Sequence, residues 1–331
     1  GNDKRTKRTC PRIKDKPMQA SQTKPIAQPA NVRRSEFGYY ELGNKPTPDE
    51  LGDYYAKKYY QQQIRTHESR YSDEELRFRR NKLDQKLRVI RSLRSKPLPD
   101  SPAFLDVGAG EGFAMAYFDS EGWDVTGLDY SSHGCQTHHP QLLERLITGD
   151  LQASVDALAA EGRRFDAILL DNVLEHLLDP AQLLRSLAPL MAPDAVLVIE
   201  VPNDFSAFQQ HLLEQKKIDR PFWVVAPDHI SYFNRDGLAR LAQACGFAER
   251  SVSADFPIDL FLFNENTNYV ANGAVGKSCH AVRVEVENLL HALSPEATIR
   301  MYQAMAELGI GRQVAGYYQL QSEPNHEGES R

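Results

Sequence analysis

The chain has 331 residues, of which 41% are hydrophobic and 25% charged, with a formal net charge of −6, a composition that suits one large core plus an added module. No apolar segment approaches the roughly 20 residues that span a bilayer, and no signal pattern opens the chain, so no membrane span and no export are predicted. The four cysteines form no C-x-x-C pair, which argues against a zinc site or a disulfide framework and favours a cytoplasmic protein.

The first 34 residues contain ten basic and only two acidic residues and few large apolar ones. We therefore expect residues 1–35 to form a basic, disordered tail, and residues 322–331 a polar one. Some basic tails contact nucleic acid or anionic surfaces. No nucleic-acid-binding module accompanies this one, so nucleic acid is not an expected partner.

Residues 36–95 are predicted to form a helical lid module in front of the main domain. Ser72 followed by Glu75 has the spacing of a capping box, which predicts a helix that runs to Leu93. Six of the fourteen tyrosines precede residue 61, and they either belong to this lid or simply pack its helices onto the main domain: Tyr39, Tyr40, Tyr54, Tyr55, Tyr59 and Tyr60.

A buried strand at Phe104–Val107 is followed by a glycine-rich turn, a helix and a second strand that ends at Asp129. Glycines at positions 108, 110 and 112 let the backbone approach a flat, polar ligand, although an ordinary tight connection has the same composition. The dinucleotide fingerprint requires a sixth-position glycine where this chain has Phe113. A nicotinamide-dependent oxidoreductase is therefore disfavoured.

Strand and helix patterns alternate along the rest of the chain, which predicts an α/β fold with a Rossmann-like sheet and helices on both faces. The main domain is expected at residues 96–321, with insertions at 203–228 and 257–308. The predicted strands are 146–151, 165–172, 195–201, 248–255 and 311–320, and the predicted helices include 180–190 and 235–245.

Polar residues follow several predicted strands, where ligands bind in such sheets. Asp129, Asp150, Asp171 and Asn203 all lie at these carboxyl ends, as does His176 shortly beyond. Asp150 is either a helix cap or a ligand contact. The one-sided arrangement indicates a binding site at this edge of the sheet.

The run from Asp106 through Gly108, Gly110 and Gly112 to Asp129 resembles motif I of class I S-adenosylmethionine-dependent methyltransferases, and the resemblance extends over residues 102–255. It implies a seven-stranded sheet whose last strand inserts antiparallel, S-adenosylmethionine as cofactor, S-adenosylhomocysteine as product, and no metal. It also implies that Asp129 bonds the ribose hydroxyls and that Asp150 lies near the adenine amino group. The cofactor-binding residues that it implies are Asp106, Gly108, Ala109, Gly110, Gly112, Asp129, Tyr130, Asp150, Leu151, Asp171 and Asn172.

Methyl transfer requires alignment and a base for the acceptor's proton. His176, in a Leu-Glu-His-Leu run, and His229, in a Pro-Asp-His stretch, resemble residues at this edge in the same superfamily, and both are catalytic candidates. We expect His229 to be the base, while each histidine has the alternative of packing and capping its helix. If His229 is not the base, the candidates are His176, His280 and Tyr232.

Aromatic residues in the 203–228 insertion either line an acceptor pocket or form the insertion's own core: Phe205, Phe208, Phe222 and Trp223. Flanking stretches at 58–61, 268–269 and 276–283 resemble methyltransferases of bacterial surface-polysaccharide and secondary-metabolite pathways. This resemblance implies a small-molecule acceptor, such as a hydroxyl or carbon of a sugar-linked compound. The alternative is a scaffold or regulatory protein that binds the cofactor without catalysis.

Overall fold

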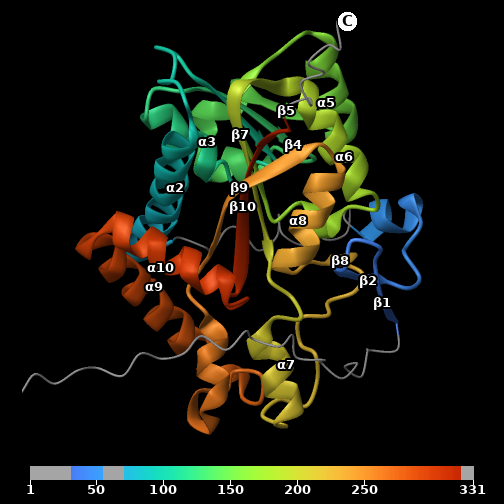
Figure 1. Cartoon of the computed structure of the whole chain (residues 1–331), viewed down its shortest axis with the longest axis vertical. Helices are drawn as coiled ribbons and strands as arrows, with labels where there is room; N and C mark the ends of the chain where they lie inside the picture. The colour runs from blue at the N-terminus through green and yellow to red at the C-terminus, as the bar shows by residue number, and fades with distance from the viewer. Residues whose placement is uncertain (1–30, 55–70, 322–331) are drawn as a thin grey trace, which may run out of the picture.

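The computed structural model describes residues 31–54 and 71–321 and is organised around a seven-stranded sheet (Figure 1). In order across it, the strands are β5 (Leu146–Thr148), β4 (Asp124–Asp129), β3 (Ala103–Val107), β6 (Phe165–Asp171), β7 (Met191–Pro202), β10 (Gln313–Leu320) and β9 (Phe247–Ala254). β10 pairs antiparallel with both β7 and β9, while the pairs from β5 to β7 are parallel. The predicted fold class and the antiparallel last strand are confirmed.

The central strands are apolar on both faces, as strands covered by helices on each side must be. In β3, Phe104 packs into one core and Leu105 into the other; β6 and β7 alternate in the same way. One core contains residues of α2 (Asp73–Leu93) and α3 (Phe113–Ser120). The other contains residues of α5 (Leu151–Ala160), α6 (Pro180–Leu187) and α8 (Arg235–Ala244), so that helices cover both faces, as Figure 1 shows.

Helix α2 begins where the capping box predicts. Ser72 Oγ accepts a hydrogen bond from Glu75 N, and the Glu75 side chain accepts one from Ser72 N. The helix ends at Leu93 and packs Leu83, Leu87 and Ile90 against the sheet. This part of the predicted lid is therefore also a structural layer of the fold.

The segment before α2 differs from the prediction. β1 (Val32–Arg34) and β2 (Tyr40–Leu42) form a hairpin, and β2 pairs antiparallel with β8 (Ser231–Tyr232). Val32 and Leu42 are buried in a third core with Trp223. The expected disordered tail thus includes a strand at residues 32–34, and the expected helical module contains β2, because apolar residues distant in sequence complete their core. Residues 1–30, with Cys10, residues 55–70 and residues 322–331 lie outside the described chain.

Both predicted insertions contain helices. α7 (Ala207–Glu214) follows β7, and α9 (Gly276–Leu293) and α10 (Pro295–Glu307) precede β10. Within the first insertion, Phe205 and Trp223 are buried in the third core, which supports the core interpretation for these two rings. Among the described residues, no helix is both long and apolar enough to cross a membrane.

Candidate functional site

The three glycines of the turn after β3 have positive φ angles, 82° at Gly108, 54° at Gly110 and 79° at Gly112. A Cβ atom at Gly108 would lie 2.5 Å from Val173 Cγ2, and one at Gly112 would lie 3.1 Å from Cys135 Sγ. At Gly110 the nearest heavy atom would be Gly108 O, 4.0 Å away. The first and third glycines are therefore required by packing and backbone conformation, and only Gly110 faces open space.

Asp129 closes the turn from the end of β4. Its Oδ2 accepts a hydrogen bond from Gly110 N at 2.8 Å, and its Oδ1 accepts one from Ser131 N at 2.9 Å. Burial raises the pKa of the Asp129 carboxyl, while these backbone hydrogen bonds lower it. The first two residues of the turn are also held by β4, because Gly108 N and Ala109 N both donate hydrogen bonds to Leu128 O.

Asp106 lies beneath the turn and is 3% exposed. Burial raises the pKa of its carboxyl to about 8, and the nearby carboxylates of Asp171 and Asp129 contribute to the increase. Asp106 is therefore largely protonated at neutral pH and acts as a neutral group under the site.

Asp150 is a helix cap, since its Oδ1 accepts a hydrogen bond from Ala153 N at 2.9 Å. Its Oδ2 accepts a hydrogen bond from Tyr130 Oη at 3.2 Å, and the Tyr130 ring is 48% exposed at the end of β4. Leu151 is buried in the core beside them. The capping interpretation is confirmed, and a ligand contact by Asp150 stays a prediction.

Asp171 ends β6 and lies next to the glycine turn, since Val107 and Leu170 are register partners. Asn172 follows with a φ of 56°, and its Nδ2 donates a hydrogen bond to Asp171 Oδ1 at 2.7 Å. Asn203, at the end of β7, is directed elsewhere: its Nδ2 donates to the carbonyls of Gly309 and Gly311.

Phe113, which departs from the dinucleotide pattern, packs against residues at the beginning of α2. Its ring centroid lies 5.5 Å from that of Tyr71, and the guanidinium of Arg79 lies 4.8 Å from the Phe113 ring. Tyr71 Oη also donates to both carboxylate oxygens of Glu111, each at 2.9 Å. Phe113, at the sixth position of the turn, thus helps to pack α2 against the turn.

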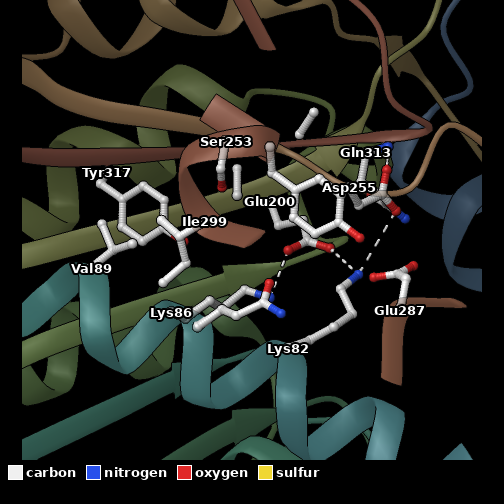
Figure 2. Close-up of a pocket in the computed structure, with 14 residues that line it drawn as sticks. Lys82, Lys86, Val89, Glu200, Ser253, Asp255, Glu287, Ile299, Gln313 and Tyr317 are labelled. Carbon is white, nitrogen blue, oxygen red and sulfur yellow. Dashed lines mark hydrogen bonds and ion pairs between the residues drawn. The ribbon is translucent and has the colours of Figure 1, made fainter. Parts of the chain in front are cut away.

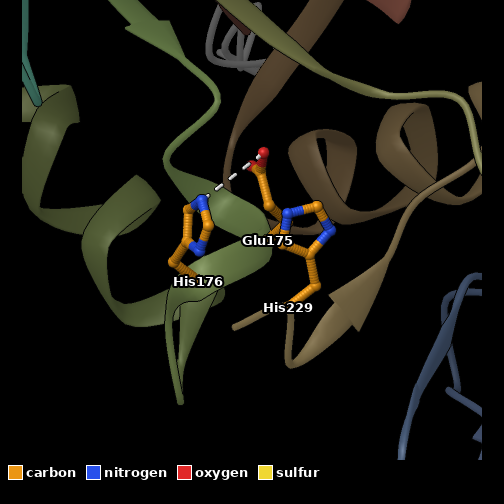
Figure 3. A group of neighbouring side chains, drawn as sticks. All are labelled: Glu175, His176 and His229. Atoms are coloured by element: carbon orange, nitrogen blue, oxygen red, sulfur yellow. Dashed lines mark ion pairs between the residues drawn. The ribbon is translucent and has the colours of Figure 1, made fainter. Parts of the chain in front are cut away.

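The two candidate catalytic histidines lie together beside Glu175 (Figure 3), with His176 in a short helical turn just beyond the carboxyl end of β6. Their ring centroids are 4.9 Å apart, with an interplanar angle of 86°. His176 Nδ1 lies 2.7 Å from Asp228 O, so this nitrogen carries the proton of the neutral ring. His176 Nε2 lies 3.8 Å from Glu175 Oε1.

Glu175 is the third member of this group and was not among the predicted site residues. It is 1% exposed, and burial raises the pKa of its carboxyl well above the usual range. Glu175, His176 and His229 offer one carboxylate oxygen and two ring nitrogens within 4.8 Å of one another, a donor set that also suits a transition-metal ion. In the sequence, Glu175 could have been found as an acidic residue that directly precedes a histidine just beyond a predicted strand.

The other two base candidates have structural partners. Tyr232 is buried, and its hydroxyl donates a hydrogen bond to the backbone carbonyl of His229 at 2.9 Å, so this hydroxyl supports the histidine's backbone. His280 is on α9, where its Nε2 lies 3.6 Å from Glu75 Oε1 on α2. His280 is therefore a contact between two helices.

Residues 76–252, more than half of the chain, match a family of methyltransferase domains, and the chain belongs to this family. The predicted class, S-adenosylmethionine-dependent methyltransferase, is confirmed, and S-adenosylmethionine is the cofactor of that class.

The chain is similar to ubiquinone biosynthesis O-methyltransferases. It is 34% identical to the Caulobacter sp. (strain K31) protein over 101 residues, 30% of this chain and 40% of that protein. It is 24% identical to the mitochondrial Arabidopsis thaliana protein over 188 residues, 53% of this chain and 57% of that protein. The chain thus spans about half the length of these relatives.

Among solved structures, it is similar to a Burkholderia thailandensis 1,6-didemethyltoxoflavin-N1-methyltransferase. The sequence identity is 14% and the TM-score 0.46, covering 88% of this chain and 100% of that one.

Proposed function

We propose that this protein transfers the methyl group of S-adenosylmethionine to a hydroxyl oxygen of a small molecule. The sulfonium–methyl bond breaks as the oxygen–methyl bond forms, giving S-adenosylhomocysteine and a methyl ether, and the hydroxyl proton passes to a base. The observation that carries the proposal is that the glycine turn, Asp129 and the His176–His229 pair lie at one edge of the sheet in a chain of the methyltransferase family.

The proposed cofactor site follows the order of the strand ends. The turn from Gly108 to Gly112 would hold the methionine end, because Gly110 faces open space. Asp129 would accept hydrogen bonds from the ribose hydroxyls. The exposed ring of Tyr130, with Asp150 and Leu151, would border the adenine, and Asp171 and Asn172 would lie near the amino acid group.

We propose His229 as the base that receives the hydroxyl proton. Its partner His176 has Nδ1 fixed by the Asp228 carbonyl, and its Nε2 is directed at Glu175, so it is better suited to support the pair. A neutral imidazole can accept a proton near neutral pH, which is what an alcohol or phenol acceptor requires.

An oxygen acceptor is favoured because the curated relatives are named as O-methyltransferases. Those names do not point to a sugar acceptor, so we propose a hydroxylated small molecule with no sugar requirement. A hydroxyl carried by an aromatic ring is the first class to test, because such an oxygen loses its proton more readily than that of an alkyl alcohol.

The experiment combines binding and turnover. Titration calorimetry with S-adenosylhomocysteine, using NAD as the control ligand, tests the cofactor site. Transfer of a labelled methyl group to a panel of phenols, alcohols and amines then tests the acceptor. Binding with transfer to phenols or alcohols supports the proposal. Binding without transfer to any panel member would favour the scaffold or regulatory alternative, and absence of binding would contradict the proposed cofactor site.

A further inference from the structure

Three acidic side chains at the carboxyl ends of neighbouring strands lie on the sheet face that α2 covers. Because side chains alternate between the two faces of a strand, Asp106 in β3, Asp171 in β6 and Glu200 in β7 lie on the same face as the residues that pack against α2. Asp171 and Glu200 are direct register partners. Two carboxylates side by side on one face of a parallel pair repel each other unless a cation lies between them.

Two lysines of α2 supply the positive charge beside Glu200 (Figure 2). Lys86 is 4% exposed, and its Nζ lies 2.6 Å from Glu200 Oε2 and 3.8 Å from Asp171 Oδ2. Lys82, one turn earlier, lies 3.0 Å from Glu200 Oε1 and 3.9 Å from Asp255 Oδ2. Each lysine thus bridges Glu200 to a second carboxylate, around a cavity of about 20 Å³.

Asp171 and Asp255, the carboxylates that the two lysines connect to Glu200, differ in how many partners they have. Asp255 also contacts Arg283 Nη2 at 2.5 Å and accepts hydrogen bonds from two backbone amides. For Asp171, Lys86 is the one cation within 4 Å in the described part of the chain, and the Asp171 side chain is 38% exposed beside the glycine turn. Asp171 therefore presents a carboxylate to the edge where the methionine end of the cofactor would lie.

The charges around Asp171 act in opposite directions. Desolvation and Glu200 raise the pKa of the Asp171 carboxyl, Lys86 and then Lys82 oppose this increase, and the overall effect is a raised pKa. Other ionisable groups that face it are Asp106, Glu175 and Tyr317. Without Lys86, the neighbouring Glu200 would favour the protonated form of Asp171.

We propose that Lys86, whose Nζ lies 3.8 Å from Asp171 Oδ2, is a positioning residue that favours the carboxylate form of Asp171, and that this carboxylate binds the α-ammonium group of the cofactor's methionine moiety. This inference rests on the proposed function. It assigns to the lid helix an electrostatic role in cofactor recognition, exerted through Asp171 and without contact between Lys86 and the cofactor.

The test compares two ligands that differ in the amino acid portion, which carries both the α-ammonium and the α-carboxylate; the pH dependence and Asp171→Asn then separate the ammonium contact. S-adenosylhomocysteine carries this portion, and 5′-methylthioadenosine lacks it. In Lys86→Met, S-adenosylhomocysteine should bind about tenfold more weakly near neutral pH, as expected for loss of one charge-assisted contact. Its affinity should recover as pH rises and Asp171 ionises, while methylthioadenosine affinity should not change. Calorimetry from pH 6 to pH 8.5 measures both.

A second variant separates electrostatics from packing. The double variant Lys86→Met with Glu200→Gln removes both the cation that lowers the pKa of Asp171 and the carboxylate that raises it. It should therefore restore the wild-type preference for S-adenosylhomocysteine over methylthioadenosine. Asp171→Asn should show the same selective loss at every pH, and it tests the ammonium contact if Lys86→Met fails to fold.

Equal weakening of both ligands, or no change for S-adenosylhomocysteine, would overturn the inference. If the wild-type protein bound neither ligand, the proposed function itself would fail. The two failures are therefore distinguishable.

Discussion

The carboxylate of Asp129 accepts a hydrogen bond from the backbone amide of Gly110 at 2.8 Å, linking the end of β4 to the middle of the glycine turn after β3. Within the turn, this contact fixes Gly110, whose φ is 54° and which is the one of its three glycines that faces open space. In the proposed site, Asp129 would therefore both support the turn and accept hydrogen bonds from the ribose.

Replacing Asp129 with Ala should weaken S-adenosylhomocysteine binding by at least about tenfold, because hydrogen bonds to a charged group contribute about 1.5 to 3 kcal/mol. Titration calorimetry measures the change. Asp100→Asn, at an exposed position, is the control and should bind like the wild type. An unchanged dissociation constant in Asp129→Ala would contradict the ribose assignment.

Gly110→Ala and Gly122→Ala form a matched pair. Both glycines have positive φ, 54° and 84°, and an added Cβ at either would meet no close neighbour. Each substitution should therefore cost about 1 to 2 kcal/mol of unfolding free energy from backbone strain. Only Gly110→Ala should also weaken S-adenosylhomocysteine binding, since its methyl group projects into the proposed site. Urea denaturation and calorimetry give the two quantities, and equal ligand affinity in the two variants would show that the space at Gly110 is not used.

His229→Ala should retain S-adenosylhomocysteine affinity and fold but lose turnover by a factor of about a hundred to ten thousand, the usual effect of removing a general base. His176→Ala should lose less, and His280→Ala, at the α2–α9 contact, should retain turnover. Labelled-methyl transfer to an acceptor identified from the panel measures all three. Assays with and without a chelator separate an imidazole base from a metal-ligand role, and normal turnover by His229→Ala would move the search for a base to His176.

Asp106 should make the protein less stable as pH rises from about 4 to 8. Its folded-state pKa of about 8 exceeds the usual value of 3.8, so between these values the folded state binds more protons than the unfolded state. The contribution is fully present below pH 4 and is lost as pH rises, with a limiting slope of about 1.4 kcal/mol per pH unit.

Asp106→Asn, which cannot ionise, should therefore flatten the pH dependence of the unfolding free energy in this window. Urea denaturation at pH 5, 6, 7 and 8 measures the slope, with Asp100→Asn as the control. A wild-type slope in Asp106→Asn would show that other groups set the pH dependence.

Local patterns were sufficient to predict much of the fold. The capping box at Ser72 and Glu75 placed the beginning of α2, because both of its hydrogen bonds are made within one turn. The apolar runs predicted buried strands, and the glycine turn with Asp129 predicted the family, which the domain match confirms. These features depend on residues close together in the sequence.

The remaining features depend on contacts between distant segments. The hairpin at β1 and β2 becomes part of the fold by pairing with β8, about 190 residues later, and no local signal in its short strands encodes that partner. Glu175 and His176 meet His229 across more than 50 residues. Lys86 reaches Asp171 and Glu200 because α2 packs on that face of the sheet. Residue type and spacing specify which elements form, whereas the charge and proton state of a buried side chain depend on neighbours that only folding brings within a few ångströms.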